Sequence, residues 1–150
     1  MAIGEICRRQ VVVARGGETV QEAARLMRRH HVGSIVVVDE RDGVRVPVGI
    51  ITDRDIVVGV VAKEVEPGAV TLAEVVARNL ATLPESAGVA EAVELMRSRG
   101  VRRLPVVGRD GALLGIVTVD DLVDLLAEEL GGLARLVSRE QARETALRSP

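Results

Sequence analysis

The sequence carries one pattern twice, as Gly49-Ile50-Ile51-Thr52-Asp53-Arg54-Asp55 and as Gly115-Ile116-Val117-Thr118-Val119-Asp120-Asp121. Both stretches read Gly, two β-branched aliphatic residues, Thr, two variable residues and Asp. Each closes a longer stretch that repeats in the same order, with Val20, Glu22, Ala23, Leu26 and Met27 matched by Val89, Glu91, Ala92, Leu95 and Met96. The chain is therefore a duplicated unit with a period of roughly 66–69 residues, which is too long for a solenoid repeat and suits a small domain in tandem.

The composition indicates a globular chain without a general attraction to nucleic acid or to membranes. Its 150 residues are 47% hydrophobic, carry a net charge of −2 and include no Phe, Tyr or Trp. The missing rings remove the platforms on which single-stranded nucleic acids stack, and the acidic balance gives no drive toward polyanions. The single cysteine, Cys7, excludes an internal disulfide and fits a reduced, cytoplasmic setting. We predict neither a signal peptide nor a membrane-spanning segment.

Short apolar runs and turn signals predict a β-α-β-β-α unit in each copy. In the first copy we expect strands at 11–14, 35–38 and 46–51, a turn at 39–43, and helices from Thr19 and from Asp53 or Arg54 to about Lys63. In the second copy we expect a short helix from Thr71, strands at 80–83, 104–107 and 113–117, a turn at 109–111, and helices at 88–99 and 119–130. Thr19-x-x-Glu22 and Thr71-x-x-Glu74 are capping boxes, in which a hydroxyl and a carboxylate satisfy the unpaired N–H groups of a helix start. The apolar stripe from Val20 through Met27 to His31 predicts a buried helix face, and Met96 is expected in the core like Met27.

These elements predict an α/β (α+β) fold of two units packed as a pseudo-twofold pair, because each sheet would leave one face that needs a partner. We place the first repeat at residues 1–66 and the second at 67–130, with the boundary at the linker that holds Pro67-Gly68. Residues 131–150 form a tail after Gly131-Gly132, and a further helix is expected from about Ser138.

On these features the chain resembles the CBS-domain (cystathionine-β-synthase domain) family, in which two tandem copies form a Bateman module. The features are the doubled Gly-h-h-Thr-x-x-Asp motif, Glu-Ala-x-x-Leu-Met before each middle strand, and the stretch Val101-Arg102-Arg103-Leu104-Pro105-Val106-Val107. The resemblance covers about residues 1–130. It implies a regulatory module rather than a catalyst, which binds adenosine nucleotides in clefts between the repeats and assembles as a flat homodimer.

The Thr and Asp of the repeated motif are the candidate ligand-binding residues. Thr52 and Thr118 lie where a strand ends and a helix begins, so free N–H groups and the helix dipole favour a phosphate there. Asp55 and Asp121 can each accept hydrogen bonds from the two hydroxyls of a ribose, which is the role that the resemblance implies. The same Thr-x-x-Asp spacing is also an ordinary helix cap. Capping and binding are compatible, and the matched copies favour at least one nucleotide site. Gly49 and Gly115 would permit a ligand to approach the backbone closely.

The resemblance also implies which segments complete each cleft. The cleft of Asp121 would borrow Ala14, Ser34 and Ile35 from the first repeat, and the cleft of Asp55 would borrow Thr82, Arg102 and Arg103 from the second. Arg102 and Arg103 could pair with phosphates or could form a solvated strand end. Arg54 is a weaker phosphate candidate, because Asp120 takes its place in the second copy. Since Gly33-Ser34 stands where the second copy has Arg102-Arg103, we expect the two clefts to differ.

Four functions are weighed on these grounds. The leading hypothesis is a non-enzymatic sensor of AMP, ADP, ATP or an adenosyl sulfonium, with no tightly required cofactor. The alternative is a dimeric scaffold with relic sites, which serves an effector protein made as a separate chain. Nucleic-acid binding through the Arg8-Arg9, Arg28-Arg29 and Arg102-Arg103 pairs is disfavoured by the charge and the missing rings. An enzyme is disfavoured because no catalytic constellation is present, and His30-His31 lacks a third metal ligand.

Overall fold

The computed structural model describes residues 1–148 and divides into two compact parts, residues 1–117 and residues from 118 onward. The first part contains both repeats up to the last strand, and the second is the C-terminal helix. Residues 149 and 150, which end the predicted tail, lie outside the described residues.

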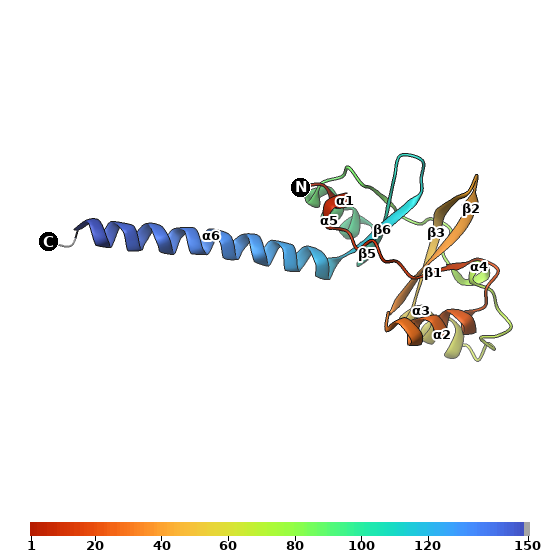
Figure 1. Cartoon of the computed structure of the whole chain (residues 1–150). Helices are drawn as coiled ribbons and strands as arrows, with labels where there is room; N and C mark the ends of the chain where they lie inside the picture. The colour runs from red at the N-terminus through yellow and green to blue at the C-terminus, as the bar shows by residue number, and fades with distance from the viewer. Residues whose placement is uncertain (149–150) are drawn as a thin grey trace. The chain divides into compact units, whose positions relative to one another are not determined.

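The first repeat forms a three-stranded sheet in the order β1-β2-β3 (Figure 1). The strand β1 (Val13–Arg15) runs parallel to β2 (Ser34–Arg41), and β2 runs antiparallel to β3 (Val44–Thr52). Residues 35–38 of β2 are each at most 2% exposed, because both faces of this central strand are covered. The sheet therefore holds the end of β3, where the repeated motif lies, in a fixed register with the start of β2.

The hairpin between β2 and β3 is longer than predicted. The strand continues to Arg41 instead of giving way to a turn at Asp39, because residues 39–41 pair with residues 44–46 of β3. The turn is reduced to Asp42 and Gly43, which both have positive φ (52° and 77°), as a tight two-residue hairpin requires. Pro47 lies inside β3, beside the register shift at Val37/Val38, which accommodates a residue without an N–H donor.

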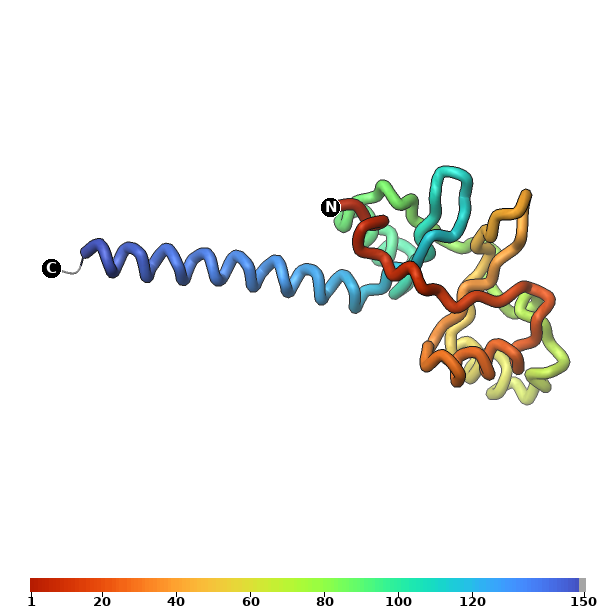
Figure 2. The backbone as a smooth tube through the Cα atoms, in the orientation of Figure 1, coloured from red at the N-terminus to blue at the C-terminus, as the bar shows by residue number. Residues whose placement is uncertain are grey.

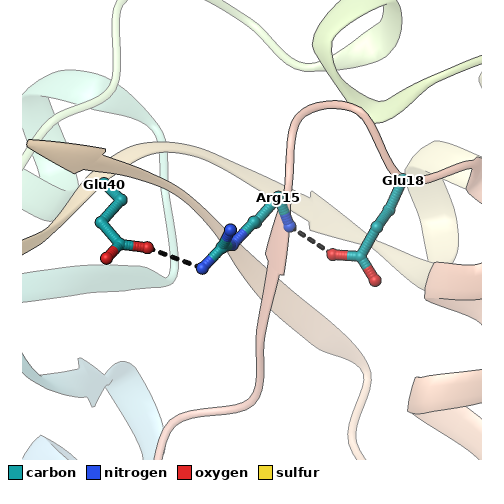
Figure 3. A network of polar contacts seen from close by, with 3 residues as sticks. All are labelled: Arg15, Glu18 and Glu40. Carbon is teal, nitrogen blue, oxygen red and sulfur yellow. Dashed lines mark hydrogen bonds and ion pairs between the residues drawn. The ribbon is translucent and has the colours of Figure 1, made fainter.

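An exposed polar network ties β1 to its neighbours (Figure 3). The Arg15 guanidinium lies 2.7 Å from a Glu40 carboxylate oxygen on β2, and the Arg15 backbone N–H donates to Glu18 in the following turn. Both side chains of the ion pair are more than half exposed, so solvent screening leaves the pair little net stabilising effect. The Glu18 contact closes the turn that leads into the first long helix.

The two long helices of the repeats follow the predicted patterns. The helix α2 (Val20–His30) begins at the Thr19–Glu22 capping box and buries Val20, Ala23 and Met27. The helix α5 (Val89–Arg99) begins at Gly88, whose N–H donates to Glu91, and buries Ala92 and Met96. The two methionines are thus core residues, as predicted. His31 is not part of the buried stripe, because it ends α2 in the left-handed conformation (φ 53°) and is exposed.

The helix after the first motif copy is shorter than predicted. It forms α3 (Asp53–Ile56) and then widens into the π-helix η1 (Val57–Val61), where the Ala62 N–H donates to the Val57 carbonyl. The run Val57-Val58-Gly59-Val60-Val61 combines β-branched residues with a glycine, and all of these are poor formers of a regular α-helix. Inserted π-turns of this kind often accompany functional sites.

The second repeat forms its own three-stranded sheet, with β4 (Leu83–Pro84), β5 (Arg103–Val107) and β6 (Leu113–Thr118) in that order. The strand β4 is shorter than predicted and starts later than residue 80, because only Leu83 and Pro84 come into parallel register with Val106 and Val107 of β5. Two sheets with their helices, one per repeat, confirm the predicted fold class.

The two repeats exchange their leading segments (Figure 2). The unpredicted helix α1 (Ile3–Ile6) belongs with the second repeat, because the Ile3 and Gly4 amides donate to the carbonyls of Ala87 and Glu85 and Arg8 pairs with Ile116. In the other direction α4 (Leu72–Val75) belongs with the first repeat, because the Leu72 and Ala73 amides donate to the carbonyls of Glu18 and Gly16. Backbone hydrogen bonds therefore run across the expected boundary at residues 66/67.

The C-terminal helix α6 runs without a break from Val119 to Arg148 (Figure 1). The prediction of a helix end at Leu130 was wrong. The tail is helical from Ser138 onward, as expected, but it continues α6 instead of forming a further helix. Two glycines cost a helix about 2 kcal/mol together, but Gly131 and Gly132 are flanked by leucine, alanine, glutamate and arginine, which are strong helix formers. No helix within residues 1–148 combines the length and the apolar character needed to cross a membrane.

Candidate functional site

A cavity of about 480 Å³ opens beside the first copy of the motif. One wall comes from the first repeat, from Ile50 and residues 52–55 at the junction of β3 and α3. The other comes from the second repeat, from residues 77 and 79–81 and from residues 99–104 at the end of α5 and the start of β5. This volume is within the usual range of small-molecule sites, about 300–1,000 Å³. Both repeats thus line one concave site.

Thr52 and Asp55 form a reciprocal cap at the start of α3 inside this cavity. The Thr52 N–H donates to Asp55 Oδ2 at 2.8 Å, and the Asp55 N–H donates to Thr52 Oγ1 at 3.1 Å. The capping interpretation of the motif is therefore correct here. It occupies only one carboxylate oxygen, since Oδ1 has no hydrogen-bond partner among residues 1–148. Asp55 Oδ1, as an acceptor, and the Thr52 hydroxyl, as a donor, remain available to a molecule in the cavity.

Four arginines and two aspartates are the charged residues that line the cavity: Arg54, Arg99, Arg102, Arg103, Asp53 and Asp55. The excess of cations favours an anionic ligand, because charges of one sign along a cleft focus the local potential. The Oδ1 of Asp53 accepts the Arg54 N–H at 2.8 Å, and the Asp53 N–H donates to the Gly33 carbonyl at 3.0 Å. Asp53 and Asp55 thus each engage one carboxylate oxygen in these contacts, and Asp55 is the one that occupies the repeated motif position.

The second copy of the motif begins α6, with a different arrangement. The Thr118 N–H and the Thr118 hydroxyl both donate to Asp121 Oδ2, at 2.9 and 2.7 Å, and the Asp121 N–H donates to Thr118 Oγ1 at 3.2 Å. In the first copy no such hydroxyl-to-carboxylate bond is present. The two motif copies are therefore unequal in their hydrogen bonding.

The remaining predicted site residues lie in or beside the two sheets. Ala14 and Ile35 are in the buried core of the first repeat, at 2% and 0% exposure, so only their backbones are available to a ligand. Ser34 starts β2 directly opposite Thr52 of β3. Thr82 does not line the cavity, although its neighbour Ala81 does. The cleft predicted between these first-repeat residues and Asp121 stays a prediction.

The motif glycines serve a role that sequence reasoning did not identify. We expected Gly49 and Gly115 to admit a ligand to the backbone. Instead, each faces an exchanged segment: a Cβ on Gly115 would lie 2.7 Å from both Arg8 O and Cys7 Sγ, and one on Gly49 would lie 2.9 Å from the Val76 side chain. Side chains at these positions would push the exchanged segments away, so the glycines are required by the packing of the two repeats.

A second cavity of about 440 Å³ shares Ile50, Asp55 and Ala77 with the first. It is lined by η1 and by Lys63, Glu74 and Val75. Two hydrogen bonds from Thr71, its N–H at 2.7 Å and its hydroxyl at 2.9 Å, lower the pKa of Glu74. Asp55 thus borders two cavities, and each is lined by residues from both repeats.

Several cavity residues were missed by sequence reasoning, namely Ile50, Asp53, Ala77, Asn79, Leu80, Ala81, Arg99 and Gly100. Most of them lie outside the repeated motif, and Asn79 lies in a stretch without regular secondary structure. Arg99 and Gly100 could have been found from the sequence. Gly100 ends α5 directly before β5, whose first residues were expected at the cleft, so the last turn of α5 also lies beside the cleft. Among the described residues, no group of three or more His, Cys, Asp and Glu side chains could hold a metal ion.

Cys7 is buried and free, as a structural residue would be. Burial raises the pKa of its thiol, since desolvation disfavours the thiolate. This lowers its reactivity in the folded chain.

Two stretches of the chain, residues 3–61 and 72–128, match the CBS domain family. The chain belongs to the CBS-domain family. An uncharacterized protein of Methanopyrus kandleri is 41% identical over 125 residues, which cover 83% of this chain and 62% of that protein. A CBS domain-containing protein of Bacillus subtilis is 36% identical over 83% of this chain and 86% of its own length.

A solved structure extends the likeness to the fold. The CBS domain pair of protein MJ0100, in complex with 5′-methylthioadenosine and S-adenosyl-L-methionine, is 26% identical to this chain. It superimposes with a TM-score of 0.74 over 86% of this chain and 98% of that one. The resemblance predicted from the motifs is thereby confirmed, as is the tandem pair.

Proposed function

We propose that this chain is a non-enzymatic, cytoplasmic sensor that binds an adenosine nucleotide in the cavity beside Thr52 and Asp55. The observation that carries the proposal is the position of the motif carboxylate, which presents an unoccupied oxygen to a cavity of about 480 Å³ lined by both repeats. A ribose offers two adjacent hydroxyls to that carboxylate. The adenosine ligands of the related CBS domain pair support this chemistry.

The cavity lining matches the other parts of such a ligand. The arginines at 54, 99, 102 and 103 provide cationic partners for phosphate groups. Backbone groups and aliphatic side chains around Leu80, Val101 and Leu104 provide a slot for a purine without aromatic residues. Because the two walls come from different repeats, a bound ligand would favour one arrangement of the repeats, and such a preference can transmit a signal.

Homodimer formation is part of this proposal. Val57, Val58 and Val61 of η1 are 52–58% exposed, and such a cluster of aliphatic side chains on one short helix is typical of an interaction surface. The same surface favours the alternative of a dimeric scaffold for a separate effector protein. Ligand binding separates the two functions, because a scaffold with relic sites would give none.

Calorimetric titration of protein freed of carried-over ligand, with AMP, ADP, ATP, 5′-methylthioadenosine and S-adenosyl-L-methionine, tests the proposal. We expect saturable binding by at least one compound, and Asp55→Ala should weaken it by about 10–100-fold, the loss expected for a hydrogen bond to a charged group. Glu91→Ala is the matched control, since it removes an equivalent capping carboxylate from α5, away from the cavity. Absence of binding by every compound at millimolar concentration would leave the scaffold as the function.

A further inference from the structure

One face of α6 carries an exposed apolar stripe. Val123, Leu126, Leu130, Leu133 and Val137 are each between 51% and 68% exposed. They follow one another at alternating steps of three and four residues, which is the spacing of the a and d positions of a coiled coil. We call these five residues the α6 seam. A stripe of this kind on a helix that also contains Gly131 and Gly132 gains stability from a covering partner rather than from helix propensity.

The charges along α6 are sorted by sign. In its first half, Val119–Leu130, every charged side chain is a carboxylate: Asp120, Asp121, Asp124, Glu128 and Glu129. In the second half, 131–148, arginines outnumber the glutamates Glu140 and Glu144: Arg135, Arg139, Arg143 and Arg148. A partner helix that covers the seam must therefore be basic beside the first half and acidic beside the second. The α6 helix of a second copy has this distribution when it runs in the opposite direction.

Charge also selects between the two orientations of such a pair. Packed helices lie about 8–10 Å apart, within the Debye length of about 10 Å at 0.1 M salt. A parallel pair would set the acidic halves of the two helices side by side. An antiparallel pair sets each acidic half beside a basic half and also opposes the two helix dipoles. The orientation is thus specified by the sequence of α6 itself.

We propose that α6 is a self-association element in which the seams of two copies of this chain pack antiparallel. When a positions are set against d positions, Leu130 lies beside Leu133 of the second copy and Leu126 beside Val137 of the second copy. In this register Asp124 and Glu128 lie at the same height along the axis as Arg139 and Arg135 of the second copy, on the outer faces of the pair, where they act through the overall charge of each half rather than through direct contact. Val123 lies beside Glu140 of the second copy, so the apolar contact is made by the other four seam residues. The proposal is independent of nucleotide binding, because no seam residue lines the cavity.

Disulfide trapping in the full chain tests the orientation directly. Leu126→Cys and Val137→Cys are made as separate proteins, mixed, oxidised under mild conditions and analysed by non-reducing electrophoresis and mass spectrometry. The antiparallel pair places these two positions side by side, whereas it separates residue 126 from its own copy by about 16 Å along the axis. Since a disulfide needs Cα atoms within about 7 Å, we expect the mixed dimer at least about tenfold above either self-dimer.

The controls use features of the same chain. The wild type, oxidised in parallel, reports any reaction of Cys7, which is buried with a raised thiol pKa. Adding Leu130→Asp and Leu133→Asp to both cysteine proteins should reduce the mixed dimer at least about tenfold, because it buries charge in the seam. Ala142→Asp, at an exposed position on the opposite face of the same helix, should leave it unchanged. Circular dichroism verifies that each variant keeps its helix.

Each other outcome overturns the proposal. Self-dimers of Leu126→Cys in excess of the mixed dimer would mean a parallel pair. An absence of trapped dimers in all mixtures would mean that α6 does not associate with a second copy, including the case in which a different protein covers the seam. A mixed dimer that survives the two seam aspartates would mean that the α6 seam is not the interface.

Discussion

Thr52 and Asp55 hold each other by two opposed hydrogen bonds, from the Thr52 N–H to Asp55 Oδ2 at 2.8 Å and from the Asp55 N–H to Thr52 Oγ1 at 3.1 Å. One pair of residues thus fixes the start of α3 and presents a carboxylate to a cavity that both repeats line. Because the cap needs one oxygen and a ligand would use the other, the two contributions of Asp55 can be separated by mutation.

Substitution of Asp55 by Asn and by Ala should separate them. The Asn side-chain oxygen can still accept the Thr52 N–H, so we expect Asp55→Asn to change the free energy of unfolding by less than about 0.5 kcal/mol. Asp55→Ala should cost about 1 kcal/mol, measured by urea denaturation. Equal destabilisation by both variants would show that the carboxylate charge, rather than the acceptor, caps α3.

Alanine at Gly115 should destabilise the fold more than alanine at Gly49. The Gly115 Cβ would collide with a backbone carbonyl, Arg8 O, whereas the Gly49 Cβ would meet only the side chain of Val76. We expect Gly115→Ala to cost about 1–3 kcal/mol, as measured by thermal and urea unfolding.

The contact of Gly49 with Val76 supplies a direct test of this cause. If the clash is local, Val76→Ala should recover part of the stability lost in Gly49→Ala, with a favourable coupling in the double-mutant cycle. It should recover nothing in Gly115→Ala, where Val76 is not a neighbour. Additive effects in the Gly49 cycle would contradict the packing role of this glycine.

Glu74 should make the stability of the fold depend on pH in the acidic range. Its pKa is lowered from 4.5 by hydrogen bonds from the N–H and hydroxyl of Thr71. A carboxyl with a lower pKa in the folded chain stabilises the fold above its unfolded pKa, and that contribution disappears as the pH falls through the folded pKa. The stability difference between wild type and Glu74→Gln should therefore be largest above about pH 5 and shrink toward pH 3. A difference that stays constant with pH would contradict this role.

Alanine at the two glycines of α6 should strengthen the helix. Gly131 and Gly132 lie within an unbroken helix and a Cβ at either would meet only an arginine side chain, at 3.4 and 3.9 Å. We expect each substitution to stabilise the helix locally by about 1 kcal/mol, visible as slower amide hydrogen exchange between residues 125 and 140. Ser138→Ala is the control, because serine costs a helix less than glycine. Unchanged exchange in both glycine variants would mean that α6 opens elsewhere.

Much of the first repeat could be predicted from the sequence because its signals are local. The Thr19–Glu22 box set the start of α2, the run Ile35-Val36-Val37-Val38 gave the buried strand, and the doubled motif located the cavity through Thr52 and Asp55. Helix ends were less reliable. Glycine was read as a stop signal at 131–132, where the flanking residues maintain the helix, and the valine run after Ile56 gave no indication of a π-turn.

Contacts between distant segments could not be predicted. Nothing in the stretch around Ile3 indicates that its amide bonds the Ala87 carbonyl, because backbone pairing of this kind leaves no side-chain pattern. The cavity residues Asn79 and Arg99 were missed for the same reason, since they are brought to the motif by the arrangement of the two repeats. Gly49 and Gly115 were interpreted as ligand-facing for the same reason, because the segments that pack against them are distant in the sequence.

The exchange of leading segments has a consequence for how such a chain can be divided or rebuilt. A protein cut at the linker would give two fragments. Each would lose the leading segment that the other supplies, and each would keep a leading segment whose hydrogen-bond partners lie in the other fragment. A single copy moved into another chain would keep most of its own core but would lose the residue that the other copy contributes, which for the first repeat is the fully buried Leu72.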